Sequence, residues 1–290
     1  MKTELSNKGD QRAWRRPVSR ILFYALLAVM SIPFVFPTVW MVASSFKPIT
    51  EIFAFPPTII PEAPTFGAYI EAFTFQPFAL QYFNSVYIAV VCTVGTLLVA
   101  SLAGYAFARI RFPGANLLFI VVLVGLLIPS EVTIVPMFQM FASWGLIDTH
   151  WPIILVSIFG APTVFSTFLM RQFFLTLPVE LEEAARLDGL GRFQIWRQIA
   201  LPLSKSALAA VSIFSFLHIW NLYLEPTVYL RSPELFTLPQ ALVRYADVYG
   251  GQMWNVQLAA ATMTALPVLL VFIVAQRQFV EGLANTGLKG

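Results

Sequence analysis

Long uncharged runs of apolar residues constrain this chain more than any other feature. Residues 21–46, 72–108 and 112–130 contain no Asp, Glu, Lys or Arg. A helix of about 20 apolar residues crosses the ~30 Å hydrocarbon core of a bilayer, and helices satisfy every backbone amide within lipid. Only 11% of the 290 residues are charged, against roughly a quarter in soluble domains. The sequence therefore predicts an all-α polytopic membrane protein.

Six transmembrane helices are expected from the positions of the apolar segments. We expect these helices at 21–42, 85–107, 117–138, 152–173, 207–224 and 256–276. They divide the chain into an N-terminal tail of 1–20, a transmembrane domain of 21–277 with loops at 44–84, 174–206 and 225–255, and a C-terminal tail of 278–290. The first apolar segment exceeds the 7–15 residues typical of a signal peptide, so an uncleaved span is favoured over a cleaved signal.

The basic residues predict how these spans are oriented. Of the 18 Lys and Arg residues, fifteen fall on the side of the membrane where the N-terminus lies, whereas Lys47, Arg231 and Arg244 fall on the other side. Positively charged loops remain in the cytoplasm. Both termini and the loop 174–206 are therefore expected to be cytoplasmic, and the loops 44–84 and 225–255 extracytoplasmic.

One polar segment interrupts the apolar pattern. The stretch "VELEEAARLDGLGRFQIWRQIALPLSK", residues 179–205, gathers four acidic and four basic side chains. Pro178 suits the start of a helix, Glu182 and Arg186 have the spacing of a helical ion pair, and Gly189 is typical of a helix end before a second, amphipathic helix. We expect a helical hairpin between the fourth and fifth spans. Its acidic residues disfavour an interfacial hairpin that touches lipid headgroups alone, so docking to another protein is favoured.

The same segment resembles a known family. From Glu183 to Pro202, "EAARLDGLGRFQIWRQIALP" has the spacing EAA-x3-G-x9-I-x-LP, which resembles the signature of the membrane subunits of binding-protein-dependent ABC importers. Further stretches resemble the sugar-importer branch and its smaller maltose-type permease, namely "NSVYIAVVCTVGTLLVASLAGYAFARIRFPG", "LLIPSEVTIVPMF", "GLIDTHWPIIL" and "QRQFVEGLANTGLKG". Two positions depart from the family pattern, since Ser206 stands where proline is common and Leu222 where an acidic residue is frequent.

The resemblance implies a transport subunit rather than an enzyme. It implies a permease that imports a sugar or related carbohydrate by alternating access across a prokaryotic inner or plasma membrane. The expected partners are a second homologous permease, two cytoplasmic ATPase subunits and an extracytoplasmic solute-binding protein. The hairpin would then form coupling helices that dock on the ATPase. The resemblance assigns this docking role to Glu183, Ala184, Ala185, Asp188 and Gly189.

No cofactor is expected on this chain. It contains no GxxxxGK[ST] loop to bind phosphates, so ATP and Mg would be bound by the partner ATPases. The two histidines, His150 and His218, lie in different regions, which leaves a metal cluster unsupported.

Two further groups of residues are candidates for contacts during transport. For the substrate path, an ionisable group near Pro129 and an aromatic and amide cluster in the fifth span suit a sugar; the candidates are Glu131, Trp220, Asn221 and Tyr223. For the solute-binding protein, the resemblance implies contact through exposed aromatic residues of the outward loop; the candidates are Tyr245, Tyr249 and Trp254. Helix packing and an interfacial aromatic belt are alternative explanations for these residues.

Other functions remain as alternatives. One alternative is an importer of the same family that carries a non-sugar solute. An ion-coupled secondary transporter would need paired intramembrane charges or an inverted repeat, and an intramembrane enzyme would need acid–base groups arranged at one membrane face. Neither pattern is evident in the sequence. Pro129 and Pro136 are candidates for a hinge, because proline removes a backbone donor and tends to kink a helix.

Overall fold

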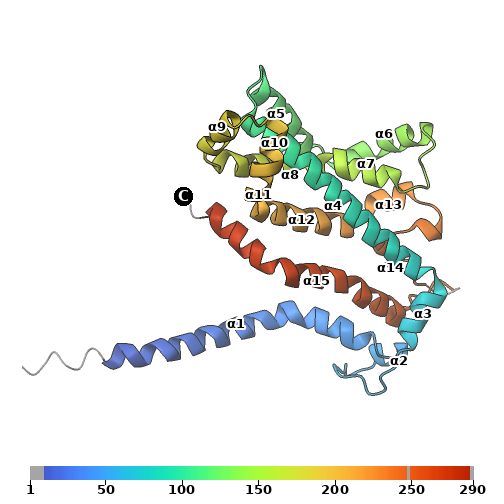
Figure 1. Ribbon diagram of the computed structural model, residues 1–290. Coiled ribbons are helices and arrows are strands. Elements are labelled where there is room, and N and C mark those ends of the chain that lie inside the picture. Colours follow the sequence, from blue (N-terminus) through green and yellow to red (C-terminus); the bar gives the residue numbers. More distant parts are fainter. Residues whose placement is uncertain (1–9, 247–248, 288–290) are drawn as a thin grey trace, which may run out of the picture. The chain divides into compact units, whose positions relative to one another are not determined.

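The computed structural model describes residues 10–246 and 249–287, with side chains for 20–246 and 249–274 (Figure 1). Within these residues every regular element is helical, and the extended pairing is one isolated bridge between Ala246 and Gln252. The predicted all-α class is confirmed.

The elements are α1 (Asp10–Ser44), α2 (Ile49–Ile52), α3 (Gly67–Phe75), α4 (Phe78–Arg109), α5 (Ala115–Val124), η1 (Gly125–Leu127), α6 (Ser130–Ser143), α7 (Trp151–Phe159), α8 (Ala161–Thr176), α9 (Val179–Leu187), α10 (Arg192–Ile195), η2 (Trp196–Ala200), α11 (Leu201–Leu203), α12 (Lys205–Trp220), α13 (Leu224–Tyr229), η3 (Pro233–Leu235), α14 (Leu238–Leu242) and α15 (Trp254–Gly287).

Four helical segments are long and apolar enough to cross a membrane. They are Arg20–Ser44, Phe78–Arg109, Trp151–Thr176 and Trp254–Val274. Two bent pairs pass the same test together: Ala115–Leu127 with Ser130–Ser143, bent by 97°, and Arg192–Leu203 with Lys205–Trp220, bent by 81°. The described part of the chain thus has four to six candidate spans, as a multi-pass membrane protein requires.

The predicted span at 117–138 is wrong as a single straight helix. The chain breaks after Leu127, Pro129 caps α6, and α6 runs through Pro136 without ending. The physical reason is local: Ile128 precedes a proline and adopts an extended conformation, as such residues favour. The predicted span at 207–224 also ends early, because α12 stops at Trp220.

The chain divides into two compact units. Among the described residues, 10–71 and 253–262 form the first, and 72–246, 249–252 and 263–287 form the second. Residues 1–9 of the predicted N-terminal tail, 247–248 of the predicted loop 225–255 and 288–290 of the predicted C-terminal tail lie outside the described residues.

In the first unit, a buried lysine organises the segment after α1. The ammonium of Lys47 donates to the carbonyl and hydroxyl oxygens of Thr58, lies 4.0 Å from Glu51 and sits over the ring of Trp40. Its side chain is 1% exposed. A hydrogen bond from the backbone of Glu62 lowers the pKa of Glu51, which keeps this partner of Lys47 ionised.

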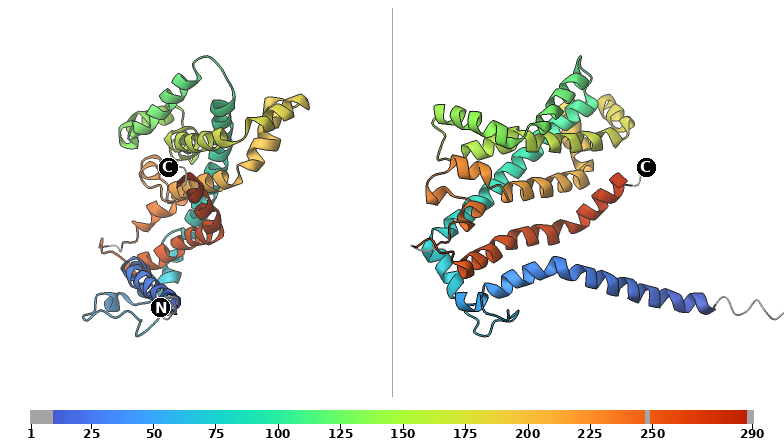
Figure 2. Two further views of the ribbon diagram at one scale, coloured as in Figure 1. Left: turned by 90° about the vertical axis from the view of Figure 1, so that its left-hand side faces the viewer. Right: turned by 180° about the vertical axis from the view of Figure 1, so that it is seen from behind.

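In the second unit, α4 packs against α7, α8 and α12 (Figures 1 and 2). Glycines permit this close packing. A Cβ atom on Gly104 would lie 2.8 Å from the Cβ of Met170, and one on Gly95 would lie 2.4 Å from Ile158. Small residues at such positions allow membrane helices to approach each other.

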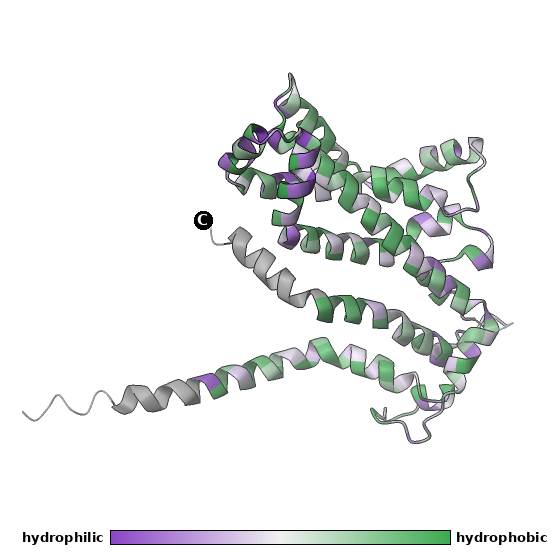
Figure 3. Ribbon diagram, in the orientation of Figure 1, coloured by the Kyte–Doolittle hydropathy of each residue, from purple (hydrophilic) through white to green (hydrophobic). Residues whose placement is uncertain are grey.

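Hydrophilic and apolar residues occupy different helices of the second unit. Apolar residues cover much of α4, α5 and α12, whereas hydrophilic residues gather on α9 and α10 (Figure 3). The α9–α10 hairpin lies near the C-terminal end of α4, which we name the hairpin end. The segments α13, η3 and α14 lie toward its N-terminal end, which we name the loop end (Figure 1).

Candidate functional site

The predicted hairpin is present, and glycine makes its turn. At the end of α9, the amide of Gly189 donates to the carbonyl of Arg186 and the amide of Leu190 donates to that of Ala185, both at 3.0 Å. Together these two hydrogen bonds form a Schellman motif, which needs a residue in the left-handed conformation after the cap. Gly189 supplies it with φ +84°. The chain then reverses, and α10 begins at Arg192.

The two faces of α9 have different environments. Glu182 and Ala185 are buried, at 5% and 4% exposed. Glu183, Ala184 and Asp188 are exposed, and Leu187 is 90% exposed. Of the predicted coupling residues, Ala185 therefore packs inward against this chain, while Glu183, Ala184, Asp188 and Gly189 remain accessible. Helical periodicity produces this division, since positions 182 and 185 share one face.

An apolar cluster lies beneath the buried face of α9. Its fully or nearly fully buried members come from α4, α8, α9, α10, η2 and α12 and are Ala100, Tyr105, Met170, Phe174, Ala185, Ile195, Trp196, Ala200 and Val211. The hairpin is thus part of the core of the second unit.

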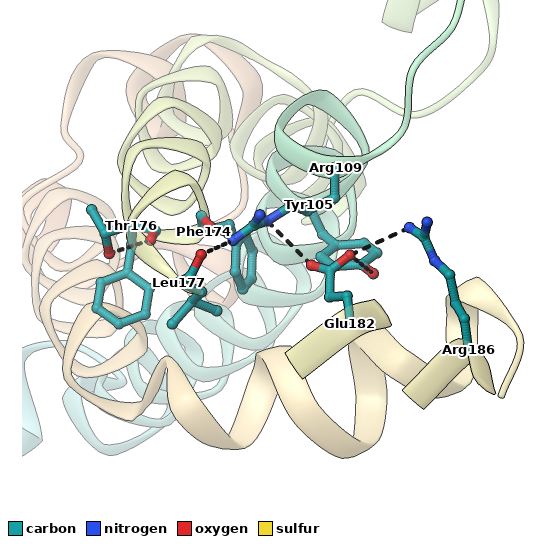
Figure 4. Close-up of polar contacts among 8 residues, drawn as sticks. Tyr105, Arg109, Phe174, Thr176, Leu177, Glu182 and Arg186 are labelled. Atoms are coloured by element: carbon teal, nitrogen blue, oxygen red, sulfur yellow. Dashed lines mark hydrogen bonds and ion pairs between the residues drawn. The ribbon is translucent and has the colours of Figure 1, made fainter. Parts of the chain in front are cut away.

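A buried ion pair also connects the hairpin to α4 (Figure 4). The Nε of Arg109 lies 3.1 Å from the Oε1 of Glu182, and the two side chains are 8% and 6% exposed. Neither of these two atoms has an aligned hydrogen-bond partner among the described residues, so the contact is primarily ionic. The other carboxylate oxygen of Glu182 accepts a hydrogen bond from Tyr105 at 3.4 Å and lies 3.6 Å from Arg186.

Arg109 also holds the end of α8. One terminal nitrogen of its guanidinium donates to the carbonyl of Phe174 at 2.6 Å and to the carbonyl of Leu177. Positive charge at this place stabilises a helix C-terminus, where carbonyl groups lack helical partners. Arg109 is itself the last residue of α4. One side chain therefore joins α4, α8 and α9.

A basic cavity of about 710 Å³ opens beside this ion pair. Its charged lining comprises Arg109, Arg111, Arg171, Arg186 and Arg192 with Glu182 and Glu183. Five guanidinium groups face two carboxylates, so the cavity is positively charged. Basic side chains are typical of the cytoplasmic boundary of membrane proteins.

Comparison with known proteins places these features in a family. Residues 96–283 match the family of binding-protein-dependent transport system inner membrane components. The chain belongs to this family. The permease is thus a membrane transport subunit and not an enzyme.

Individual relatives match over nearly the whole chain. The permease is 38% identical over 282 residues to the arabinooligosaccharides transport system permease protein AraQ of Halalkalibacterium halodurans, covering 95% of this chain and 100% of that protein. It is 33% identical to the galactooligosaccharides transport system permease protein GanQ of Bacillus subtilis, covering 95% and 98%.

A solved structure has the same fold. A chain from a bacterial ABC transporter involved in the import of the acidic polysaccharide alginate superposes with a TM-score of 0.78 at 23% identity, covering 95% of the permease and 99% of that chain.

The structure does not bring the predicted substrate-path residues together in one cavity. Trp220 is 3% exposed and stacks on Phe216 at 5.4 Å. The amide of Asn221 donates to its own helix, Tyr223 is 45% exposed, and Glu131 is exposed in the first turn of α6. The exposure of Glu131 follows from the break at Pro129, which places this residue at a helix start.

Another cavity of about 740 Å³ lies beside the broken span. Its lining includes Pro129, Thr133, Ser215, His218 and Glu225. Neither His218 nor Glu225 was predicted to line a site. The sequence feature that could have identified them is an ionisable side chain within or just after an apolar segment. Their approach to α6 depends on the 97° bend of the broken span. Among the described side chains, no group of three or more His, Cys, Asp or Glu residues is arranged to hold a metal ion.

The aromatic candidates for a binding-protein contact differ in exposure. Tyr249 is 94% exposed, and Trp254 is 43% exposed with its ring against Phe53. Tyr245 is fully buried, and its hydroxyl donates to the carbonyl of Ala72 at 3.1 Å. This burial raises the pKa of Tyr245 to about 12. The expectation of an exposed ring at Tyr245 is wrong, because a phenol with a backbone acceptor packs well within a loop core.

At the loop end, polar side chains bind the backbone of the α13–α14 segment. The amide of Asn84 donates to the carbonyls of Glu234 and Phe236 at 2.7 and 3.2 Å. His150 contacts the carbonyl of Leu235 at 2.7 Å and the hydroxyl of Tyr87. These contacts fix the path of the loop relative to α4.

A carboxylate forms a second clamp at the loop end. Asp148 accepts hydrogen bonds from the amides of Arg231 and Ser232 at 2.8 and 2.9 Å and from the hydroxyl of Ser232. These bonds, led by that of the Ser232 hydroxyl, lower the pKa of Asp148. The clamp therefore favours the ionised acid.

Proposed function

We propose that this permease imports a sugar or related carbohydrate, driven by ATP hydrolysis on separate subunits. Its relatives belong to transport systems named for arabinooligosaccharides and galactooligosaccharides, which supports the substrate class. A non-sugar solute within the same family is the alternative. The α9–α10 hairpin carries the mechanical part of the proposal, because one face of α9 is built into the core and the other is free.

In this proposal the chain spans the membrane six times. The two bent helix pairs supply the spans beyond the four straight ones. The transmembrane permease domain covers 21–277, both termini and the loop 174–206 are cytoplasmic, and the loops 44–84 and 225–255 are extracytoplasmic. The distribution of Lys and Arg supports this orientation.

The hairpin docks on a cytoplasmic ATPase through the accessible side of α9. Glu183, Ala184, Asp188 and Gly189 belong to this side, and Leu187 adds a large apolar side chain to it. Ala185 acts from the inner side, where its small size lets α9 lie close to the core. ATP and Mg are bound by the ATPases.

The remaining partners complete an alternating-access cycle. A second homologous permease lines the path, and an extracytoplasmic solute-binding protein delivers the sugar. Closure of two ATPase subunits moves the hairpins and turns the spans from inward-facing to outward-facing. Tyr249 and Trp254 are the accessible candidates for the binding-protein contact, and Glu131, Asn221 and Tyr223 remain candidates for the path.

The turn at Gly189 provides the test. The Gly189→Val variant in the assembled transporter introduces a β-branched residue at positive φ, a conformation that such residues avoid. We expect sugar-stimulated ATP hydrolysis to fall by at least about tenfold, since a strain above 1.4 kcal/mol changes an equilibrium by that factor. Gly145→Val is the matched control, because Gly145 also has positive φ and a Cβ atom added to it would meet nothing within 4 Å.

Two outcomes would contradict the proposal. Equal rates of ATP hydrolysis in the Gly189→Val and Gly145→Val transporters would show that the hairpin does not couple the permease to the ATPase. Sugar uptake that persists without any ATPase subunit would favour an ion-coupled secondary transporter instead.

A further inference from the structure

The guanidinium of Arg109 is the point where three helices of the second unit meet (Figure 4). We propose that Arg109 and Glu182 are positioning residues that transmit the movement of α9 to α4 and α8. This inference rests on the proposed function, because it assumes that an ATPase moves α9. Neither residue needs to touch ATP or sugar.

The argument begins with how a short helix transmits force. With nine residues, α9 is too short to be stable by itself. Any displacement applied to its exposed face reaches the membrane helices through its buried face. There the described contacts are Ala185 in the apolar cluster and Glu182 at the ion pair.

These two contacts differ in what it costs to break them. Apolar burial is non-directional, so the contact of Ala185 tolerates sliding and rotation of α9. The Glu182 carboxylate and the Arg109 guanidinium are both buried, and separating a buried pair of charges is strongly destabilising. Glu182 therefore stays with Arg109 when α9 moves, whereas the apolar cluster supplies general adhesion.

Arginine suits the other half of the connection. Its rigid, planar fork allows the Nε to face Glu182 while a terminal nitrogen donates to the carbonyls of Phe174 and Leu177. Lysine has one charged nitrogen and no such fork. Because Arg109 ends α4 and binds the end of α8, movement of Glu182 acts on both helices through one rigid group.

A nearby basic residue serves as a contrast. Arg186 approaches the same carboxylate at 3.6 Å, but its side chain is 52% exposed. Exposed pairs are weak and screened by salt. The positioning role therefore belongs to Arg109.

The first experiment compares two glutamates on α9 in the complete transporter, reconstituted with its ATPase and binding-protein partners. Glu182→Gln removes the buried charge with little change of shape, and Glu180→Gln makes the same change at an exposed position of the same helix. The measured quantity is sugar transported per ATP hydrolysed. We expect Glu182→Gln to lower this ratio by about tenfold or more, as loss of a charged contact implies, and Glu180→Gln to leave it within about twofold. Arg109→Lys should give an intermediate ratio.

The second experiment separates positioning from folding. The double variant Arg109→Met with Glu182→Leu replaces the buried pair by apolar side chains, which often preserves or increases stability. We expect native-like thermal stability and ATPase co-purification, together with a ratio as low as that of Glu182→Gln. This variant also decides the question if Glu182→Gln fails to assemble.

The inference is overturned if the double variant recovers native coupling, or if Glu182→Gln transports as efficiently as Glu180→Gln. Failure of the proposed function looks different. In that case the unaltered permease would neither co-purify with an ATPase nor stimulate ATP hydrolysis.

Discussion

The two ends of α4 hold their neighbouring segments by different chemistry. At the hairpin end, a buried ion pair connects α9 to Arg109. At the loop end, Asn84, His150 and Asp148 bind backbone groups of the α13–α14 segment. At the hairpin end, α9 is thus held by one charged side chain facing another, whereas at the loop end side chains hold the main chain of the neighbouring segment.

This difference affects what each end can do. A side-chain pair lets a helix keep its own backbone bonds and move as a body. Bonds to loop backbone hold a segment that has few such bonds of its own, which fixes its path. We infer that the hairpin end is built for transmitted movement and the loop end for a constant shape.

The largest expected effect comes from breaking the ion pair at the hairpin end. Arg109→Ala leaves Glu182 buried without its main partner, which costs about 3–5 kcal/mol in comparable cases. Thermal unfolding of the solubilised transporter measures this loss. Arg111→Ala is the control, because Arg111 is exposed and its replacement should change the free energy of unfolding by less than about 0.5 kcal/mol. Equal losses of unfolding free energy in both variants would show that the buried pair stabilises the protein no more than an exposed arginine does.

A smaller effect is expected at the loop end from Asn84→Ala. The variant loses two neutral hydrogen bonds to the carbonyls of Glu234 and Phe236, which corresponds to about 2 kcal/mol. The same unfolding assay applies, with Asn221→Ala as control because that amide bonds within an exposed helix end. A loss as large as that of Arg109→Ala would mean that the buried ion pair gives the hairpin end no greater stability than neutral hydrogen bonds give the loop end.

The smallest effect concerns the pH dependence of the Asp148 clamp. Because the pKa of Asp148 is lowered from its ordinary value of 3.8, its contribution is present above that value and is lost as pH falls through the lowered pKa. Asp148→Asn imitates the protonated acid. Hydrogen exchange of the Arg231 and Ser232 amides should therefore be faster in the variant at neutral pH, and the difference should shrink below about pH 3.8. A difference that persists unchanged into acid would show that the charge plays no part.

Several features of the fold and site were predictable from sequence because their causes are local. Apolar run length determined the helical class. The turn at Gly189 follows from the left-handed conformation that glycine readily adopts. Pro129 also gave a correct indication of a kink, although the size of the bend, 97°, depends on packing.

Other features depend on residues distant in the chain. Nothing near Arg109 in the sequence identifies Glu182 as its partner, and the helical spacing of Glu182 and Arg186 pointed to the weaker, exposed pair. The burial of Tyr245 and the approach of His218 and Glu225 to α6 have the same cause. Hydropathy identifies a polar group but not its neighbour.

The sequence by itself determined that this chain is a helical membrane protein with one polar hairpin, since run length, turn chemistry and charge are properties of short segments. The tertiary structure alone decided which face of that hairpin is buried and which arginine holds it. The packing of α4 against α8 brings Arg109 to the carbonyls of Phe174 and Leu177 and to Glu182, and only a folded core creates that meeting point.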